Sequence, residues 1–421
     1  MSTWFDKLLR IAKKSELVKK TYQNVISSFV QTHVGEITPM QPRPSQHNGL
    51  RFNLLVPSIN KEHLFGGIST ALKFFERLVP SGVEKRIILT DAAPGEDDLQ
   101  TFTEYKLLTC DSDETHLSLI VPFSDRYQKT IPVRANDVFI TTAWWTAYGA
   151  QRIVEWQSRH YNQDPKPIIY FIQDYEPCFY PWSSQSVLAE STYKYTGPQI
   201  GVFNTSLLRD YVLRLGYRFT ETYSFEPQLN SELLRHLKQA NLKNKKRKIL
   251  IYGRPSVPRN AFTLIMEALR IWAWKNESFR QWEILSVGEK HSDIEIGNGI
   301  IVRSKGKMTL SEYAAQLTEA SVGVSLMISP HPSYPPLEMA HFGMMVITNS
   351  FQNKDLSEWH DNIVSIQDLT PMKIAEQLEE LCLRFERDHY IGLTGQTRIH
   401  SYLQENDLFP FVKNIIKNYV V

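Results

Sequence analysis

The chain has 421 residues, of which 42% are apolar and 22% charged, and its formal net charge is +2. This length exceeds what one ordinary core supports, and the composition is typical of a globular protein, so we expect two domains. The small net charge excludes an overall polybasic nucleic-acid binder. No apolar run approaches the roughly 20 residues of a membrane-spanning helix. Cys110, Cys178 and Cys382 lack metal-ligand spacing, so we expect reduced thiols in a cytoplasmic protein.

The first 30 residues predict a basic amphipathic helix. Apolar side chains between Trp4 and Ala12 share one helical face, and basic side chains between Lys7 and Lys20 supply positive charge. The segment lacks the apolar core and cleavage site of a secretory signal, so we expect it to stay on the protein. Two interpretations are open: the helix packs on its own domain, or it docks on a partner or on the inner face of the cell membrane.

Strands and helices alternate after a proline-rich, polar segment at 38–48 that predicts a linker. The first half of the chain has expected strands at 51–57, 85–90, 137–141 and 167–172, with expected helices at 68–78 and 146–160. Such alternation predicts a parallel sheet covered on both faces.

The charge run KNKKRK at 243–248 predicts a solvated linker at a domain boundary. Beyond it the alternation restarts, with expected strands at 249–254, 282–288, 299–304, 322–328 and 344–348 and expected helices at 261–274, 310–319 and 371–388. We therefore predict an α/β protein of two Rossmann-like doubly wound domains facing a central cleft, with an N-terminal helical extension. In such folds ligands bind at the carboxyl ends of the strands.

Two loops contain residues suited to phosphate. YGRPSVPRNAF ends a strand and opens a helix, and its Arg254 and Arg259 offer forked donors near a helix N-terminus, an arrangement that suits a pyrophosphate. A surface role is the alternative for either arginine. The glycine pair Gly66 and Gly67 in FGGIST lets a phosphate or sugar approach backbone N–H groups closely, although a lone glycine pair is a weak signal.

Carboxylates at two places have competing interpretations. Glu338, in SPHPSYPPLEMAHFGMMVITN, caps a local helix or binds a ligand. Asp111 and Asp113 form an Asp-x-Asp pattern that could hold a divalent metal, but their polar surroundings favour an exposed turn. The sequence contains no HExxH, Walker or GxSxG motif. We expect no metal site.

Five segments in the same order resemble family 4 glycosyltransferases, two-domain enzymes of the GT-B fold: FGGISTALKFFERL, YFIQDYEP, YGRPSVPRNAF, SVGEK and SPHPSYPPLEMAHFGMMVITN. The resemblance implies an acceptor domain at 49–235, joined by a C-terminal helix at about 400–421, and a nucleotide-sugar donor domain at 236–399. The helix and linker at 1–48 precede them. It also implies a nucleotide sugar and a glycan acceptor as partners and no nucleic acid, and it leaves a homodimer open.

The resemblance also assigns roles to residues. Glu338 matches the second glutamate of the family's Glu-x7-Glu motif, which holds the ribose of the donor, and Arg259 replaces its phosphate lysine. Asp174 is the candidate acceptor-side carboxylate, with the capping of a local turn as its alternative. The implied nucleotide-binding set is Gly66, Gly67, Arg254, Arg259, Lys307, Leu337 and Glu338; the sugar-binding set is Gln173, His331, Ser333 and Tyr334; the catalytic set is Asp174, Arg254 and Arg259.

Two departures from the family pattern bear on the sugar. Pro330 stands where the first glutamate of the motif would be, and Gln173 and Asp174 stand where many members have a histidine near the 6-hydroxyl. A narrower resemblance to rhamnosyltransferases of bacterial S-layer glycan assembly agrees with this, because rhamnose is a 6-deoxy sugar. It implies a retaining, metal-independent enzyme that uses dTDP-L-rhamnose. The alternatives are an inverting GT-B transferase with another nucleotide sugar, in which Asp174 is the base, and a non-catalytic glycan-binding relative.

Overall fold

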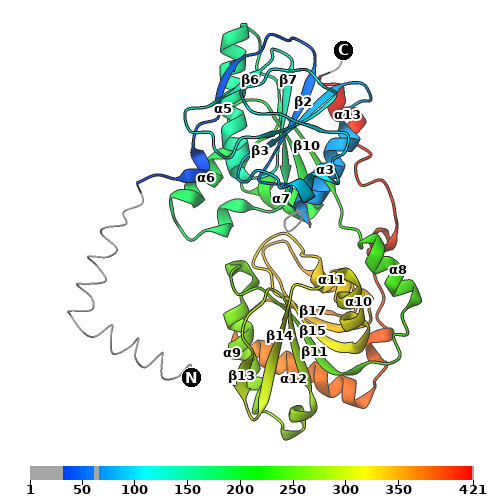
Figure 1. The fold of residues 1–421 in the computed structure, drawn as a ribbon. Helices are drawn as coiled ribbons and strands as arrows, with labels where there is room; N and C mark the ends of the chain where they lie inside the picture. The colour runs from blue at the N-terminus through cyan, green and yellow to red at the C-terminus, as the bar shows by residue number, and fades with distance from the viewer. Residues whose placement is uncertain (1–31, 61–65, 420–421) are drawn as a thin grey trace, which may run out of the picture. The chain divides into compact units, whose positions relative to one another are not determined.

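The computed structural model describes residues 32–60 and 66–419, so the amphipathic helix expected at 1–30 lies outside the described residues. The chain forms two units, Met1–Pro39 and Met40–Val421. In the first unit, the described residues form the short 3₁₀ helix η1 (Gly35–Ile37). The remaining elements belong to the second unit (Figure 1).

The first large sheet contains eight parallel strands among the described residues, in the order β10-β9-β8-β7-β2-β3-β5-β4. Its strands are β2 (Arg51–Val56), β3 (Glu84–Leu89), β4 (Lys106–Leu107), β5 (Ser118–Pro122), β7 (Asp137–Thr141), β8 (Ile168–Ile172), β9 (Gln199–Asn204) and β10 (Glu221–Phe225). The strand order reverses at β2, which pairs with β3 on one side and β7 on the other. Ligands bind at the carboxyl end of such a switch point in doubly wound folds.

Helices cover both faces of this sheet (Figure 1). On one face, Phe74 and Phe75 of α3 (Gly67–Leu78) pack in the same core as Val412 and Ile415 of α13 (Val412–Ile416). On the other face lie α5 (Trp144–Tyr161), α6 (Ser184–Tyr193) and α7 (Ser206–Arg214). Burial on both sides explains why the central strands are almost continuously apolar.

The second large sheet has seven strands within the described part of the chain, ordered β13-β14-β12-β11-β15-β16-β17. They are β11 (Lys246–Gly253), β12 (Glu283–Gly288), β13 (Ile294–Gly297), β14 (Ile300–Gly306), β15 (Ala320–Val324), β16 (Met345–Asn349) and β17 (Ile363–Ile366). The pairings are parallel except that of β13 with β14. α9 (Phe262–Ala273) and α12 (Pro371–Arg387) cover one face, whereas α8 (Ser231–Gln239), α10 (Leu310–Glu319) and α11 (Pro335–His341) cover the other. The prediction of two doubly wound α/β domains is confirmed.

The linker expected at 38–48 is partly a strand. β1 (Gln41–Pro44) pairs in parallel with β6 (Thr130–Val133) and carries two prolines, which an edge strand tolerates. Arg43 in this strand donates hydrogen bonds to the carbonyls of Cys110 and Thr130, at 3.0 and 2.8 Å. Polar composition predicted a solvated linker because these long-range partners are invisible in the local sequence.

The charge run at 243–248 is only partly a solvated linker, since four of its six residues are exposed and two are held by internal partners. Lys245 donates to the carbonyls of Leu317 and Phe342, at 2.8 and 2.7 Å, and burial lowers its pKa to about 7. Lys248 is buried in β11 and pairs with Glu319 at 2.6 Å. The run therefore begins the first strand of the second sheet.

The chain crosses from the first core to the second before the second sheet begins, and it returns to the first core after that sheet ends. Leu233 and Leu234 of α8 pack in the second core, and Phe409 lies in the first core. In the region expected to be helical at about 400–421, the described residues form the 3₁₀ helix η7 (His400–Leu403) and α13. No helix within residues 32–60 and 66–419 is both long enough and apolar enough to cross a membrane.

Candidate functional site

The site lies where the strands of both sheets end. Asp174 follows β8, Arg254 follows β11, and residues 325–334 follow β15, so three carboxyl ends contribute to it. The strand expected at 322–328 stops at Val324, which leaves the next ten residues as a loop. Placement at carboxyl ends near switch points is the placement that ligand sites have in this class of fold.

Asp174 is buried and contacts both domains. Its Oδ1 accepts a hydrogen bond from the backbone N–H of Tyr175, at 2.8 Å, and another from the hydroxyl of Ser329. Its Oδ2 lies 3.5 Å from Nε of Arg259. The local turn cap considered as an alternative is therefore present, and the same carboxylate also faces an arginine of the second domain.

Arg259 is held by its backbone and by an aromatic ring. It lies in the 3₁₀ helix η3 (Pro258–Asn260), and its carbonyl accepts a hydrogen bond from the N–H of Ile328, at 2.7 Å. Its Cζ is 4.0 Å from the centre of the Phe179 ring, a cation–π contact. Its buried Nε has no hydrogen-bond partner, and burial lowers its pKa. That Nε instead faces the carboxylate of Asp174 at 3.5 Å, an ion pair without a hydrogen bond.

Arg254 is half-buried at the end of β11, where two glycine-terminated strands meet. Gly288, which ends β12, has φ of +114°, and a Cβ there would lie 3.1 Å from the carbonyl oxygen of Gly253 and 3.2 Å from Cγ of Arg254. Glycine at 288 is therefore needed both for the backbone and for the packing of the arginine.

Glu338 lies in the first turn of α11, a helix that Pro335 and Pro336 begin. Burial raises its pKa to about 7, and the neighbouring hydroxyl of Tyr313 acts in the opposite direction. Leu337 is fully buried in the second core, with no part of the residue exposed. Leu337 thereby fixes the orientation of the helix that carries Glu338.

The predicted sugar loop is tightly organised by its own residues. The backbone N–H of Ser333 donates to Nδ1 of His331 at 3.0 Å, and Ser333 has φ of +69°, a strained conformation for a non-glycine residue. The hydroxyl of Tyr334 is 3.3 Å from the amide of Asn204, which ends β9 of the first sheet. Burial lowers the pKa of His331 to about 4, so its ring is neutral at pH 7, and its buried Nε2 has no partner.

The glycine pair lies against the acceptor-side strand end. A Cβ added to Gly67 would lie 1.6 Å from Oε1 of Gln173, so no other residue fits there without displacing that side chain. Gly66 has φ of +61° and precedes α3. The structure thus brings Gly67 and Gln173 together, and the side chain of Gln173 fills the space beside this glycine. Lys307 is exposed directly after β14.

Three buried residues of this region were not singled out from the sequence. Ser329 contacts Asp174; Glu176 accepts a hydrogen bond from the hydroxyl of Tyr170, at 3.0 Å; and Lys354 donates to the carbonyl of Met327. Burial raises the pKa of Glu176 to about 8 and lowers that of Lys354 to about 7. Of these three residues, Glu176 could have been identified from the sequence, because it lies two residues after the candidate Asp174.

The Asp-x-Asp pattern has a structural role. Oδ1 of Asp113 accepts from the hydroxyl of Ser45 at 2.8 Å, and Oδ2 accepts from the N–H of Gln46 at 2.7 Å. The carbonyl of Asp111 accepts from Arg43 at 2.7 Å. These contacts hold the segment around β1. Across the part of the chain that the structure describes, no group of three His, Cys, Asp or Glu side chains could hold a metal ion.

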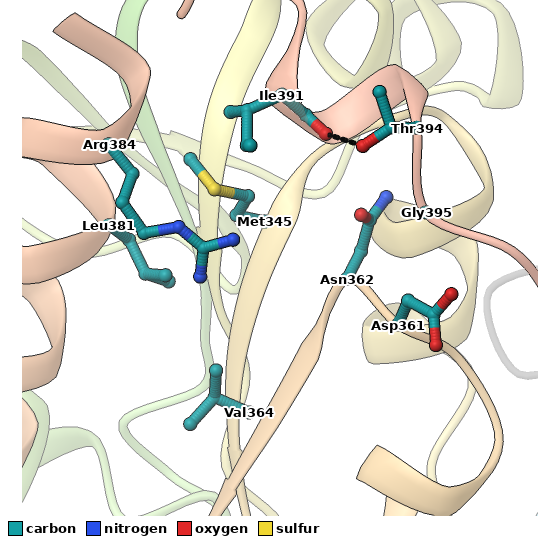
Figure 2. Close-up of a pocket in the computed structure, with 9 residues that line it drawn as sticks. All are labelled: Met345, Asp361, Asn362, Val364, Leu381, Arg384, Ile391, Thr394 and Gly395. Carbon is teal, nitrogen blue, oxygen red and sulfur yellow. Dashed lines mark hydrogen bonds between the residues drawn. The ribbon is translucent and has the colours of Figure 1, made fainter. Parts of the chain in front are cut away.

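A cavity of about 130 Å³ lies elsewhere in the second domain (Figure 2). Its lining includes Met345, the first residue of β16, and Val364, near the start of β17. Asn362 and Arg384 line it as well. The cavity therefore lies at the amino ends of these strands, and the residues around Asp174 lie at carboxyl ends.

Two domain families match the chain in the order of the two sheets. The family described as WsaF, N-terminal domain, matches residues 51–206, and the family described as WsaF, C-terminal domain, matches residues 247–379. The chain belongs to the WsaF family. The matched segments contain most strands of the two sheets together with Asp174, Arg259 and Glu338.

One curated relative of this WsaF-family chain is the O-antigen biosynthesis protein RfbC of Myxococcus xanthus. The two are 30% identical over 284 residues, which make up 67% of this chain and 21% of RfbC. The chain thus spans about a fifth of the length of that relative.

Solved structures establish the GT-B architecture of this WsaF-family chain. HepE of Anabaena, determined in complex with UDP, has a TM-score of 0.51 at 11% identity, covering 88% of this chain and 98% of HepE. WaaG, a glycosyltransferase involved in lipopolysaccharide biosynthesis, has a TM-score of 0.52 at 10% identity, covering 86% of this chain and 98% of WaaG. At such low identity these likenesses show the fold alone.

Proposed function

We propose that the chain is a glycosyltransferase that moves a sugar from a nucleotide-sugar donor to a hydroxyl of a growing bacterial surface polysaccharide. The observation that carries the proposal is the approach of Asp174, at a strand end of the first domain, to Arg259, at a strand end of the second. A carboxylate beside an arginine brings together the groups needed at the acceptor hydroxyl and at the leaving diphosphate. The names of RfbC and WaaG, which refer to O-antigen and lipopolysaccharide, support the choice of pathway class.

In this proposal Arg254, Arg259 and backbone amides balance the charge of the leaving diphosphate, so that no divalent ion is needed. Glu338 accepts a hydrogen bond from a hydroxyl of the nucleotide's pentose, which in a dTDP donor is the 3′-hydroxyl of the deoxyribose. Asp174 acts as the base toward the acceptor or stabilises positive charge at the anomeric carbon, and the configuration at that carbon is retained. The guanidinium groups of Arg254 and Arg259, five residues apart in one loop, support an anionic ligand at this position.

The donor we propose is dTDP-L-rhamnose. Support comes from the resemblance to S-layer glycan rhamnosyltransferases, and from Pro330 at the position of the sugar-contacting glutamate. Gln173, His331, Ser333 and Tyr334 remain the proposed contacts of the sugar, and Gly66, Gly67 and Lys307 remain proposed contacts of the nucleotide.

We also propose that residues 1–30 dock on an anionic membrane surface, because their predicted helix combines an apolar face with a cluster of cations. Deletion of these residues is then expected to abolish binding to anionic vesicles and to leave turnover of a water-soluble acceptor intact. Loss of thermal stability on deletion would instead favour a helix that packs on its own domain.

A panel of nucleotides and nucleotide sugars tests the proposed function. A ligand that binds only the native state raises the melting temperature, so dTDP and dTDP-L-rhamnose are expected to raise it. When the panel is incubated with the enzyme and a rhamnoside acceptor, dTDP-L-rhamnose is expected to yield a longer glycan and free dTDP. Nucleotide binding without product from any donor would favour the non-catalytic relative.

A further inference from the structure

The loop after the 3₁₀ helix η2 (Glu176–Phe179) presents an aromatic side chain entirely to solvent. Trp182 is 102% exposed, and Val187, one turn into α6, is 64% exposed. A tryptophan gains more than most side chains from contact with a partner, because its ring combines a large apolar face with an N–H donor. Trp182, between η2 and α6, therefore contributes nothing to the packing of its own domain and is available to a partner.

This loop is tied to the candidate site at its first residue. The ring of Phe179 contacts the guanidinium of Arg259, whose Nε lies 3.5 Å from Asp174. Trp182 follows Phe179 by three residues, so their Cα atoms are at most about 11 Å apart. The exposed ring is thus within reach of a chain-like ligand whose end lies at Asp174.

Neighbouring aromatic side chains fix the base of the loop. The hydroxyl of Tyr180 accepts a hydrogen bond from Nε1 of Trp144, at 2.9 Å, and the rings of Trp144 and Trp145 pack edge to face at 5.8 Å. Nε1 of Trp145 donates to Asp91 at 3.0 Å. Phe179, Tyr180 and Trp182 form what we call the aromatic loop. It is anchored on α5 and is therefore preorganised for binding.

Charge distinguishes between a glycan and a membrane as the occupant. Residues 167–193 contain no lysine or arginine, and they include Asp174, Glu176 and Glu190. Asp174 faces Arg259 at 3.5 Å, Glu190 pairs with Lys194 at 2.7 Å, and burial raises the pKa of Glu176 to about 8. The cations beside this loop are therefore already paired, and an anionic lipid surface would find no free positive charge among the described residues there. A glycan chain offers hydroxyl groups for carboxylates and serines, such as the exposed Ser184, and weakly polar ring faces for aromatic side chains.

We propose that the aromatic loop is an acceptor subsite, in which Trp182 stacks on a sugar ring of the glycan behind the residue that reacts at Asp174. This inference rests on the proposed function, which it extends by naming the acceptor as an oligosaccharide that is held through more than one sugar. A site of this kind favours long acceptors over short ones.

The test compares transfer to methyl α-L-rhamnoside with transfer to linear oligorhamnosides of increasing length. In the wild type, KM is expected to fall as the acceptor lengthens. In Trp182→Ala this advantage is expected to shrink by about fivefold, which corresponds to ~1 kcal/mol, and Trp182→Phe is expected to keep most of it. Trp274→Ala is the matched control, because Trp274 is 70% exposed but follows α9 in the second domain.

Direct binding separates this inference from the proposed function. Calorimetry with the longest oligorhamnoside and no donor is expected to show weaker binding to Trp182→Ala than to Trp274→Ala. If transfer depends on acceptor length equally in the wild type and in all variants, the subsite is overturned but the proposed glycosyltransferase activity is not. Glycan binding that needs Trp182, without transfer from any donor, would overturn the proposed function alone. Trp182→Ala that loses only its binding to anionic vesicles would overturn the subsite in favour of a membrane contact.

Discussion

The hydroxyl of Ser329 donates a hydrogen bond to the carboxylate of Asp174. Ser329 belongs to the loop after β15 of the second sheet, and Asp174 directly follows β8 of the first, so this bond links two strand ends of different domains. Because Oδ1 of Asp174 also accepts from the N–H of Tyr175, the second oxygen, Oδ2, has fewer partners and faces Arg259. Oδ2 is therefore the atom suited to receive a proton or to face developing charge.

Replacing Asp174 with Asn keeps its shape and its acceptor for Ser329 but removes the basic oxygen. We expect the transfer rate to fall by at least about 100-fold, the usual contribution of a general base, while nucleotide affinity changes little. Steady-state kinetics with a fixed acceptor measures this. Ser329→Ala should have a smaller effect, because it removes a donor to Oδ1 and the acceptor of the His331 N–H but leaves the carboxylate of Asp174 in place.

Asp164→Asn is the control for this substitution, since Asp164 is exposed between α5 and β8. An Asp174→Asn enzyme that transfers sugar at the wild-type rate would reduce Asp174 to the cap of a local turn.

Arg259 presents a flat face to Phe179, and in the proposed function its forked donors bind the diphosphate. Arg259→Met should lower kcat/KM by about 100-fold or more, as for the loss of one donor to a developing oxyanion. The kcat/KM of Arg259→Lys should lie between those of the wild type and of Arg259→Met, because lysine keeps the charge but loses the fork and the stacking. Arg270→Met, which breaks only the pair of Arg270 with the exposed Glu267 on α9, should behave as wild type. An Arg259→Met variant with unchanged kcat/KM would exclude Arg259 from the diphosphate site.

Ionisation of Glu338 as the pH rises is expected to lower the stability of the fold and to strengthen nucleotide binding. Burial raises its pKa from 4.5 to about 7, so the folded state holds a proton that the unfolded state has released between these pH values. The free energy of unfolding therefore falls as pH rises through this window, by at most about 3 kcal/mol from this group. Nucleotide affinity should instead rise toward pH 7, because the ionised carboxylate is the better acceptor for ribose hydroxyls.

Glu338→Gln should flatten both pH profiles. At pH 8 we expect the variant to unfold at a higher temperature than wild type and to bind dTDP about tenfold more weakly, as for the loss of a charge-assisted hydrogen bond. Melting curves and calorimetry at pH 5 and pH 8 measure the two effects, with the exposed Glu358→Gln as control. A variant that binds dTDP as tightly as wild type at pH 8 would remove Glu338 from the nucleotide site.

The buried strands were predictable because their chemistry is local. β2 and β7 are short, nearly continuous apolar runs, and their bounds differ from the expected ones by at most one residue. β9 and β10 were missed because QIGVFN and ETYSF mix polar and apolar positions. The lysines at 245 and 248 looked solvated because their partners, on α10 and after α11, lie far away in the sequence.

The site was predictable only as a set of strand ends. The sequence indicated Arg254 and Arg259 by their place in a loop after a predicted strand, and the family resemblance indicated Asp174. It could not indicate the contact of Asp174 with Ser329, which depends on how the two domains pack. Lys354 was missed for the same reason, since its burial is set by the loop that contains Met327.

The absence of a metal requirement is expected to appear as activity that persists in excess EDTA. Asp113→Asn should then leave the transfer rate unchanged and lower the stability of the fold by about 1 kcal/mol, because it weakens the hydrogen bonds to Ser45 and Gln46. Loss of activity in EDTA that magnesium or manganese restores would contradict the proposal and return attention to Asp111 and Asp113.

Donor choice depends on the loop from Pro330 to Tyr334. With proline where the family's glutamate would be, the proposed sugar pocket lacks a strong acceptor for hexose hydroxyls, and its neutral His331 has an unpaired Nε2. A carboxylate in the pocket would lose its hydrogen-bond partner if the bound sugar lacked a hydroxyl. Because this pocket has no such carboxylate, it tolerates a deoxy sugar. We expect dTDP-L-rhamnose to be used in preference to UDP-glucose and GDP-mannose by at least about tenfold, ~1.4 kcal/mol in the transition state.

Variants of this loop should separate the sugar from the nucleotide. His331→Ala and Tyr334→Phe are expected to lower kcat/KM for dTDP-L-rhamnose and to leave the affinity for free dTDP nearly unchanged, because these side chains lie on the loop ahead of α11. Glu338→Gln should weaken all three donors, since the deoxyribose of dTDP-L-rhamnose and the ribose of UDP-glucose and GDP-mannose share a 3′-hydroxyl. Competition assays with the three donors, together with calorimetry on dTDP, measure both effects. Equal rates with UDP-glucose, or a His331→Ala variant that loses dTDP affinity, would show that the loop holds the nucleotide and does not select the sugar.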